Sequence, residues 1–234
     1  MRKRTVIWKA LAALVVMMMI GACSGSPHVR SITLTFIRHA ESQANADNVV
    51  NTDIPGPSLT EEGKAQAEQL AHQLSRNNFD GIYVSDMVRT QQTAAPLAHA
   101  LGKPVEVLPG LREIDAGWYN NTSTKRADLT YLLAPTDWLK GDRKNAIPGS
   151  ISGNEFNDQF TAAVQKIYDS GNTKPVAFSH GEAIMYWTLM NVKNPKDSLV
   201  TSHRLPNLGR VVVTGSPATG WTLVDWDGIR DFTY

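Results

Sequence analysis

Cysteine is nearly absent from this 234-residue sequence, which contains only Cys23. Four of the six histidines lack the paired or HExxH-type spacing of protein metal sites, namely His28, His72, His99 and His203. With neither a cysteine cluster nor such a histidine pair, the sequence excludes the usual metal centres. We therefore expect no metal and no cofactor.

A basic excess is missing as well. The formal net charge is +1, but residues 1–22 hold four of the 23 basic residues and none of the 22 acidic ones, so the remainder carries −3. Because proteins that bind nucleic acid show clustered positive charge, nucleic acid is excluded as a partner. The 42% hydrophobic and 19% charged content is typical of one globular domain.

Long apolar runs are limited to Ala10–Ile20, which follows the basic segment Met1–Lys9. The run is too short for a stable transmembrane helix, and this order is typical of a secretory signal. Its end, from Ile20 to Cys23, resembles a bacterial lipobox. An ordinary signal peptide with an incidental cysteine is the alternative. The resemblance implies cleavage before Cys23, a lipid on that residue, and attachment to the extracytoplasmic face of the cell membrane.

The sequence therefore divides into a lipoprotein signal peptide at 1–22, a tether at 23–31 and one domain at 32–234. Small polar residues and Pro27 suit the tether to holding a domain away from a membrane. Residues 118–150 mix aromatic side chains with Gly, Pro and Asn and show little periodicity. This pattern predicts a partly helical insertion that caps the site and selects the substrate.

Strand and helix patterns alternate along the domain. Apolar and β-branched residues gather in six segments that we expect to be strands: 32–38, 81–84, 103–107, 175–179, 210–214 and 221–226. Capping residues and periodicity predict four main helices: one from Thr60, one from the cap Ser85-Asp86 to Gly102, one from the capping box Ser152 to Glu155 onward, and one at 182–192. The alternation predicts an α/β fold with a mainly parallel sheet.

Polar residues replace apolar ones abruptly where the first strand ends, at Arg38 and His39. Ligands of open α/β sheets bind at the carboxyl ends of the strands, so this pair is placed for chemistry. A guanidinium matches phosphate oxygens, and a neutral imidazole nitrogen can attack phosphorus. The alternative is a solvated loop with a chance Arg-His pair, and matches elsewhere in the chain decide between the two.

The segment from Arg38 to Asn45 resembles the opening motif of the histidine phosphatase superfamily, also called phosphoglycerate-mutase-like, which reads Arg-His-Gly-Glu-Ser/Thr followed shortly by Asn. Five residues match it: Arg38, His39, Glu41, Ser42 and Asn45. Ala40 replaces the usual Gly. One methyl group is the smallest possible intrusion beside the nucleophile, so we expect it to be tolerated.

Three further segments resemble the family in the same order. Arg89 lies in the family's Ser-x-x-x-Arg-Thr-x-x-Thr-Ala run, Glu113 in its Leu-x-Glu-x-x-x-Gly frame, and His180 in its Ser-His-Gly. Tyr119-Asn120-Asn121 replaces the aromatic-Glu-Gly that often follows the glutamate, which leaves this rim of the pocket distinct. The resemblance extends from about Thr33 to Asp227, almost the whole domain.

The resemblance implies a three-layer α/β sandwich and a metal-independent phosphomonoester hydrolase that acts through phosphohistidine on a small phosphorylated substrate. The implied catalytic residues are His39 as nucleophile, Glu113 as proton donor, and His180. The implied phosphate-binding residues are Arg38, Asn45, Arg89 and His180. Ser42 and Gly181 are expected to contact the substrate. Asp115 is the nearest rival of Glu113 as the acid.

These roles carry electrostatic expectations. Cationic neighbours should depress the pKa of His39, and a backbone carbonyl should fix its other ring nitrogen. A proton donor at neutral pH needs a raised pKa, so Glu113 should lie in a partly dry pocket. His180 precedes a helix, where backbone amides favour an anion.

Two other functions are compatible with these residues. A phosphoglycerate mutase-type phosphotransferase would use the same phosphohistidine, although export argues against it because glycolytic intermediates are cytosolic. A lipid-anchored protein with weak catalysis could instead bind phosphorylated ligands of the cell envelope. The complete set of catalytic residue types argues against this binding protein.

Overall fold

The computed structural model describes residues 29–232. The expectations for the signal peptide and for Cys23 therefore lie outside the described residues. None of the helices within residues 29–232 has the length and apolar character that a membrane span requires.

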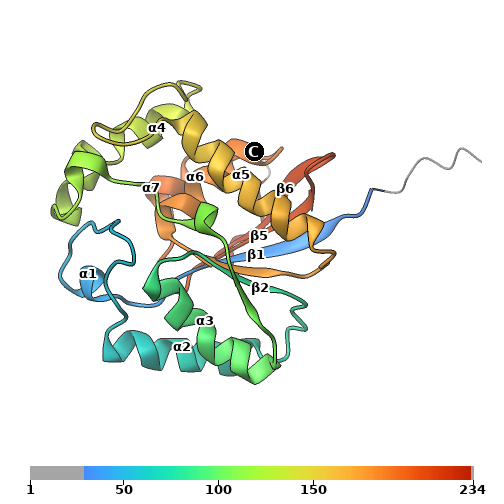
Figure 1. Ribbon diagram of the computed structural model, residues 1–234. Coiled ribbons are helices and arrows are strands. Elements are labelled where there is room, and N and C mark those ends of the chain that lie inside the picture. Colours follow the sequence, from blue (N-terminus) through green and yellow to red (C-terminus); the bar gives the residue numbers. More distant parts are fainter. Residues whose placement is uncertain (1–28, 233–234) are drawn as a thin grey trace, which may run out of the picture.

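The described residues form a six-stranded sheet with helices on both faces (Figure 1). The strands are β1 (Ile32–Arg38), β2 (Ile82–Val84), β3 (Val105–Val107), β4 (Val176–Ser179), β5 (Arg210–Ser216) and β6 (Gly220–Trp226). The α-helices are α1 (Gln43–Ala46), α2 (Glu61–Leu74), α3 (Val88–Leu101), α4 (Leu133–Leu139), α5 (Gly153–Asp169), α6 (Gly181–Asn191) and α7 (Leu199–Ser202). Three 3-10 helices are η1 (Pro109–Leu111), η2 (Gly117–Tyr119) and η3 (Thr124–Leu129).

The strand order is β3-β2-β4-β1-β5-β6. The pairs β3 with β2, β2 with β4 and β4 with β1 are parallel, whereas β5 is antiparallel to both β1 and β6. The prediction of a mainly parallel sheet is confirmed. Parallel strands need long crossovers, which α2, α3 and α5 supply, while a short turn suffices to join β5 to β6.

Alternating residues of β1 point into the two halves of the core. Phe36 packs against the rings of Phe160 in α5 and Trp187 in α6, with centroid distances of 5.6 Å and 5.5 Å. Ile37 faces the opposite side and joins a cluster that contains Leu70 of α2 and Leu97 of α3. Because both faces of the central strands are buried under helices, the expected three-layer sandwich is confirmed (Figure 1).

Local capping signals identify most helix ends correctly. Thr60 Oγ1 accepts a hydrogen bond of 2.9 Å from the Gly63 amide at the start of α2, and Gly102 ends α3 in the left-handed conformation with φ of 61°. The capping box of Ser152 and Glu155 is also present. These predictions are confirmed. The sequence was sufficient for them because capping depends on residues close together in the chain.

The predicted cap of α3 is wrong. The helix begins at Val88 after Met87, which makes no side-chain capping bond. Asp86 forms an ion pair with Arg112 instead. A distant guanidinium thus removes the capping carboxylate, and Ser85 is left to contact the site described below.

The segment 118–150 contains η3 and α4, as its pattern predicts, and it packs into the core of the domain. Tyr131, Leu132 and Trp138 are almost completely buried in the cluster that lies over β1. Trp138 stacks on Phe156 of α5 at 5.7 Å. This packing attaches the segment to the core through these three side chains.

Candidate active site

Three predicted site residues meet where β1, β2 and β4 end. His39 follows β1, Arg89 lies in the first turn of α3 after β2, and His180 follows β4. The Nε of Arg89 lies 3.1 Å from Nε2 of His39 and 3.2 Å from Nδ1 of His180. The two imidazole rings are edge to face at 5.2 Å. One guanidinium N–H therefore points at two imidazole nitrogens.

The tautomer of His39 follows from its second hydrogen bond. Its Nδ1 lies 2.7 Å from the carbonyl oxygen of Ala40, which can only accept, so Nδ1 carries the proton and Nε2 the lone pair. Burial lowers the pKa of His39 well below its ordinary value, and the positive charges of Arg89 and Arg38 lower it further. The expected neutral imidazole held by a backbone carbonyl is present, with burial as the larger cause.

His180 is fully buried and also held neutral. Because its Nδ1 accepts from Arg89, its Nε2 donates to the hydroxyl of Ser85 at 2.9 Å. The Ser85 hydroxyl lies 2.8 Å from that of Thr90. Burial lowers the pKa of His180 well below its ordinary value, with further lowering by Arg89 and His39. Ser85 and Thr90 thus fix the ring that faces His39.

Arg38 and Arg89 each have a buried nitrogen without a hydrogen-bond partner among the described residues. These atoms are Nε of Arg38 and Nη1 of Arg89. Arg38 is held by its Nη1, which donates to the carbonyl of Leu205 at 2.6 Å, and Arg89 by its Nη2, which donates to that of Asn51 at 3.3 Å. Since buried donors are normally paired, two orphaned guanidinium donors mark a site for an anion.

Asn45 faces the same cavity through the network that fixes it. Its Oδ1 accepts hydrogen bonds of 3.1 Å from the amide of Ser42 and from Nδ2 of Asn207. Asn207 also donates to the carbonyl of His39 at 3.0 Å. This orientation leaves the Nδ2 group of Asn45 as a donor toward an anion. The Ser42 hydroxyl also bonds to Asn45 and caps α1, and its substrate contact stays a prediction.

Gly181 begins α6 beside the Arg38 side chain. A Cβ at this position would lie 3.3 Å from both Cδ and Nε of Arg38. Glycine therefore lets the helix approach the guanidinium group closely. Its direct contact with a substrate stays a prediction.

The carboxylate of Glu113 is bound by backbone amides. Oε1 accepts from Ala183 at 2.8 Å and from Ile114 at 3.0 Å, and Oε2 accepts from Glu182 at 3.3 Å. Burial raises the pKa of Glu113 to about 7, with a further increase from the negative charge of Glu182, and these effects outweigh the amides. The expected raised pKa is present.

This arrangement corrects one expectation about the start of α6. The helix start after His180 was expected to favour an anion, and the group that its Glu182 and Ala183 amides bind is the Glu113 side chain. The helix start thus holds the candidate acid, and the orphaned arginine donors remain available for another anion.

Asp115, the rival acid, lies outside this arrangement. Its side chain is exposed, and Oδ1 accepts from the Gly117 amide at 3.0 Å and from the Thr52 hydroxyl at 3.3 Å. It lines a neighbouring cavity of about 380 Å³ and not the one that contains His39. The geometry favours Glu113, which borders both cavities.

The cavity over His39 has a volume of about 100 Å³. Sequence-predicted residues that line it are Arg38, His39, Ser42, Asn45, Arg89 and Glu113. His180 and Gly181 are not among the residues that line this cavity. Residues that sequence reasoning did not assign also line it, among them Thr52, Thr124, Tyr131 and Glu182. Glu182 directly follows the Ser-His-Gly match, and that position was the only signal for it.

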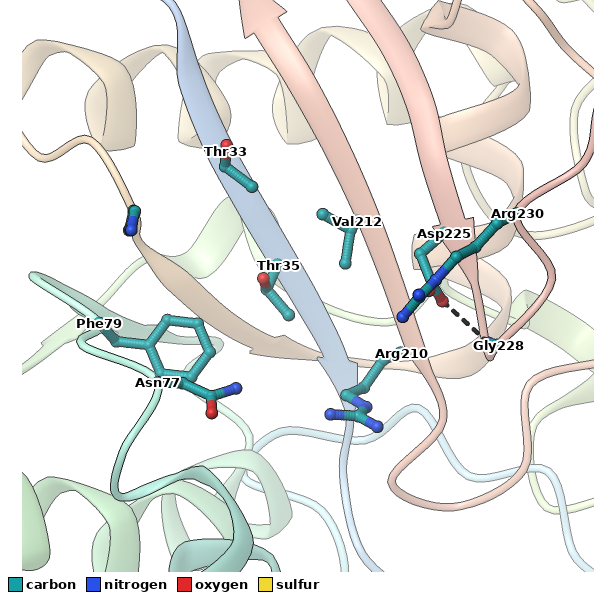
Figure 2. Close-up of a pocket in the computed structure, with 10 residues that line it drawn as sticks. Thr33, Thr35, Asn77, Phe79, Arg210, Val212, Asp225, Gly228 and Arg230 are labelled. Carbon is teal, nitrogen blue, oxygen red and sulfur yellow. Dashed lines mark hydrogen bonds and ion pairs between the residues drawn. The ribbon is translucent and has the colours of Figure 1, made fainter.

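A second cavity lies away from these residues, on the sheet near the start of β1. It has a volume of about 300 Å³ and is bordered by Thr33, Thr35 and Val212 on the strands and by the positively charged Lys174, Arg210 and Arg230 (Figure 2). No histidine or glutamate lines it. The larger cavity therefore lacks the groups that make the smaller one chemically distinctive.

Ala40 is accommodated without crowding the site. Its amide donates to the hydroxyl of Thr93 at 3.0 Å, and its methyl group belongs to a small buried cluster with Leu59 and Ala67. The departure from glycine at this position thus adds an apolar contact. Within residues 29–232, no group of three or more His, Cys, Asp or Glu side chains is arranged to hold a metal ion.

Comparison with known proteins places this arrangement in a family. Residues 34–227 match the profile of the histidine phosphatase superfamily (branch 1). The chain is 44% identical over 216 residues to the PE-PGRS family protein PE_PGRS11 of Mycobacterium tuberculosis, with 86% of this chain and 37% of that protein aligned. The chain thus spans little more than a third of the length of that relative.

Shorter relatives align over most of their length. The chain is 29% identical over 192 residues to the probable phosphoglycerate mutase GpmB of Yersinia enterocolitica, covering 80% of this chain and 88% of that protein. Among solved structures, a mycobacterial glucosyl-3-phosphoglycerate phosphatase superposes with a TM-score of 0.69 at 21% identity, covering 86% of this chain and all of that one. This last likeness concerns the fold alone. Together with the profile match, these relatives show that the chain belongs to the histidine phosphatase superfamily.

Proposed function

We propose that the protein is a phosphomonoester hydrolase that acts through a phosphohistidine at His39. The observation that supports this most strongly is the Arg89 Nε–H shared between the lone pairs of His39 and His180. It keeps a neutral nucleophile beside the orphaned donors of Arg38 and Arg89. Attacking nitrogen and anion site are therefore adjacent.

Binding of a phosphate group should first redirect Arg89. In the free protein its Nε–H occupies the lone pair of His39, and a phosphate oxygen is a stronger acceptor for a guanidinium. Once Arg89 donates to the phosphate, Nε2 of His39 is free to attack phosphorus. His180 can donate to the same phosphate when its Nδ1 carries the proton, since the Ser85 hydroxyl can then donate to its Nε2.

The first chemical step forms the bond between Nε2 of His39 and phosphorus while the ester P–O bond breaks. Arg38, Arg89 and Asn45 supply donors to the equatorial oxygens, where charge is concentrated. Glu113 gives its proton to the departing alkoxide. In the second step Glu113 takes a proton from the water that attacks phosphorus, and the P–N bond breaks. A pKa of about 7 allows both roles at neutral pH.

Trapping the intermediate tests this function. The protein is mixed with a ³²P-labelled phosphomonoester, quenched rapidly, and analysed for protein-bound phosphate. Phosphate stable to base and labile to acid is expected on the wild type and absent from His39→Ala. Turnover without any such adduct would show that hydrolysis follows another route.

A phosphotransferase is the second candidate, favoured by the 29% identity to a probable phosphoglycerate mutase over most of its length. The two functions share the phosphohistidine and differ in its acceptor. An assay primed with 2,3-bisphosphoglycerate distinguishes them, because a mutase interconverts 2- and 3-phosphoglycerate whereas a hydrolase releases inorganic phosphate.

The location we propose is the extracytoplasmic face of the cell membrane, with a lipid on Cys23. The support is in the sequence: the basic segment, the apolar run Ala10–Ile20 and the lipobox-like end. Phosphate would then be released from envelope or external substrates. This location also favours a hydrolase, since glycolytic intermediates are cytosolic.

A further inference from the structure

Glu182 borders the cavity over His39 and has one buried oxygen without a partner among the described residues. Its Oε1 accepts from Nη2 of Arg204 at 2.7 Å, while Oε2 is buried and has no hydrogen-bond partner among the described residues. Its side chain is 18% exposed. A buried carboxylate oxygen without a donor is costly, and the side chain that carries it borders the cavity over His39. Oε2 of Glu182 is therefore a hydrogen-bond acceptor without a donor among the described residues.

Arg204, the cation that is hydrogen-bonded to Glu182, is already neutralised. Arg204 donates from Nη1 to Asp128 of η3 at 2.6 Å as well as from Nη2 to Glu182. Two carboxylates thus share one guanidinium, which leaves this group of three side chains with one net negative charge. The pairing also joins the segment 118–150 to the start of α6.

A cavity of about 410 Å³ adjoins the one over His39 at this position. Both cavities are bordered by Arg38, Asn45, Tyr131 and Glu182, so the larger one lies directly beside the cavity over His39. The larger space adds the polar residues Asn48 and Asn207, the apolar Ala127 and Leu132, and the paired Arg204. Its size and mixed lining fit a small hydrophilic alcohol.

We propose that this adjoining cavity of about 410 Å³ binds the leaving group and that Oε2 of Glu182 accepts a hydrogen bond from it. The preferred substrates are then phosphomonoesters of polyols or amino alcohols, whose hydroxyl or ammonium groups can donate. A leaving group with a carboxylate is disfavoured, because Arg204 is already paired and Arg38 faces the phosphate. This assignment rests on the proposed function and names the substrate class for that site.

Four small phosphate esters test the assignment. Glycerol 1-phosphate and phosphoethanolamine carry donors, propyl phosphate carries none, and 3-phosphoglycerate carries a carboxylate beside its one hydroxyl donor. The first two should exceed propyl phosphate in kcat/KM by about 10- to 100-fold, the range for a hydrogen bond to a charged group, and 3-phosphoglycerate should fall below propyl phosphate. Equal kcat/KM for glycerol 1-phosphate and propyl phosphate overturns the assignment and leaves the hydrolase function intact.

Replacing each carboxylate partner of Arg204 by its amide shows which residue causes the substrate preference. Glu182→Gln should reduce the advantage of phosphoethanolamine over propyl phosphate by about tenfold or more and raise 3-phosphoglycerate relative to propyl phosphate. Asp128→Asn removes one charge from the same guanidinium but keeps Oε2 of Glu182, so it should retain the preference. Ratios between substrates cancel any change in the acidity of Glu113. A preference lost equally in both variants contradicts the role of Oε2.

Binding provides a readout that does not require turnover. In His39→Ala, calorimetric titration should show tighter binding of glycerol 1-phosphate than of propyl phosphate, and addition of Glu182→Gln should narrow the difference. If no ester is hydrolysed by the wild type, the proposed function is wrong. The titration still decides the subsite, because tighter binding of glycerol 1-phosphate supports it and equal or weaker binding rejects it.

Discussion

Oε1 of Glu113 accepts a hydrogen bond of 2.8 Å from the backbone amide of Ala183. This bond attaches the candidate acid to the start of α6, the helix that His180 precedes. The start of this helix therefore places the buried His180 and the candidate acid side by side. Buried amides favour the carboxylate form, whereas the dry surroundings and Glu182 favour the protonated form, and the balance gives a pKa of about 7.

Glu113→Gln should selectively impair substrates that need a proton on the leaving oxygen. Glutamine can still accept the Ala183 amide bond but donates no proton in the reaction, and general acid catalysis contributes roughly 10² to 10⁴ in rate. Hydrolysis of an alkyl phosphate should fall by about that factor, while p-nitrophenyl phosphate, whose phenolate departs readily, should lose much less. Asp115→Asn is the control and should show no such selectivity. Equal losses on both substrates would assign Glu113 a structural role.

The pH dependence should follow the raised pKa of Glu113. A pKa of about 7 means that the proton needed for the leaving group is present below pH 7 and is lost above it. For an alkyl phosphate, kcat/KM should fall by about tenfold per pH unit above 7. His39 adds no acidic limb near neutrality, because its pKa lies well below its ordinary value. Ionisation of the substrate affects the wild type and Glu113→Gln equally, so the comparison between them isolates the contribution of Glu113. An equally steep fall of kcat/KM in this variant contradicts the assignment.

Gly181→Ala should weaken phosphate binding with little effect on stability. The added Cβ would lie 3.3 Å from Cδ and Nε of Arg38, so the guanidinium must shift by a few tenths of an ångström. The loss should be smaller than the roughly 10²-fold that a 1 Å misplacement can cost. Competitive inhibition by inorganic phosphate measures the affinity, and thermal unfolding provides the control. Unchanged inhibition would mean that Arg38 does not hold the phosphate through this edge.

Cys23→Ser should release the protein from the membrane or leave its signal peptide uncleaved. Lipoprotein processing requires a thiol for the thioether, and a serine hydroxyl does not replace it. Membrane fractionation and intact mass measurement report the two outcomes. The same fractionation and mass in variant and wild type would exclude lipidation at this residue.

Elements whose signals are local could be predicted from the sequence. The strand β1 alternates between two buried faces and then turns polar at Arg38, and Thr60 and Gly102 cap their helices as their residue types indicate. The family resemblance singled out His39, Arg89 and His180, each of which follows a predicted strand. Parallel strands bring their carboxyl ends to one edge, so these residues were expected to meet. These features follow from neighbouring residues and from one topological rule.

Tertiary contacts decided the rest. Asp86 pairs with Arg112 and does not cap α3. Asn207 hydrogen-bonds to Asn45 from 162 positions away, and an amide of α6 binds Glu113. Each depends on which distant group lies nearest when the layers pack, and hydrogen bonds and burial act over a few ångströms of space. Residue types and strand ends in the sequence determined which groups gather at the site. Only packing decided which of them are paired, and the oxygen of Glu182 remained without a partner in the described chain.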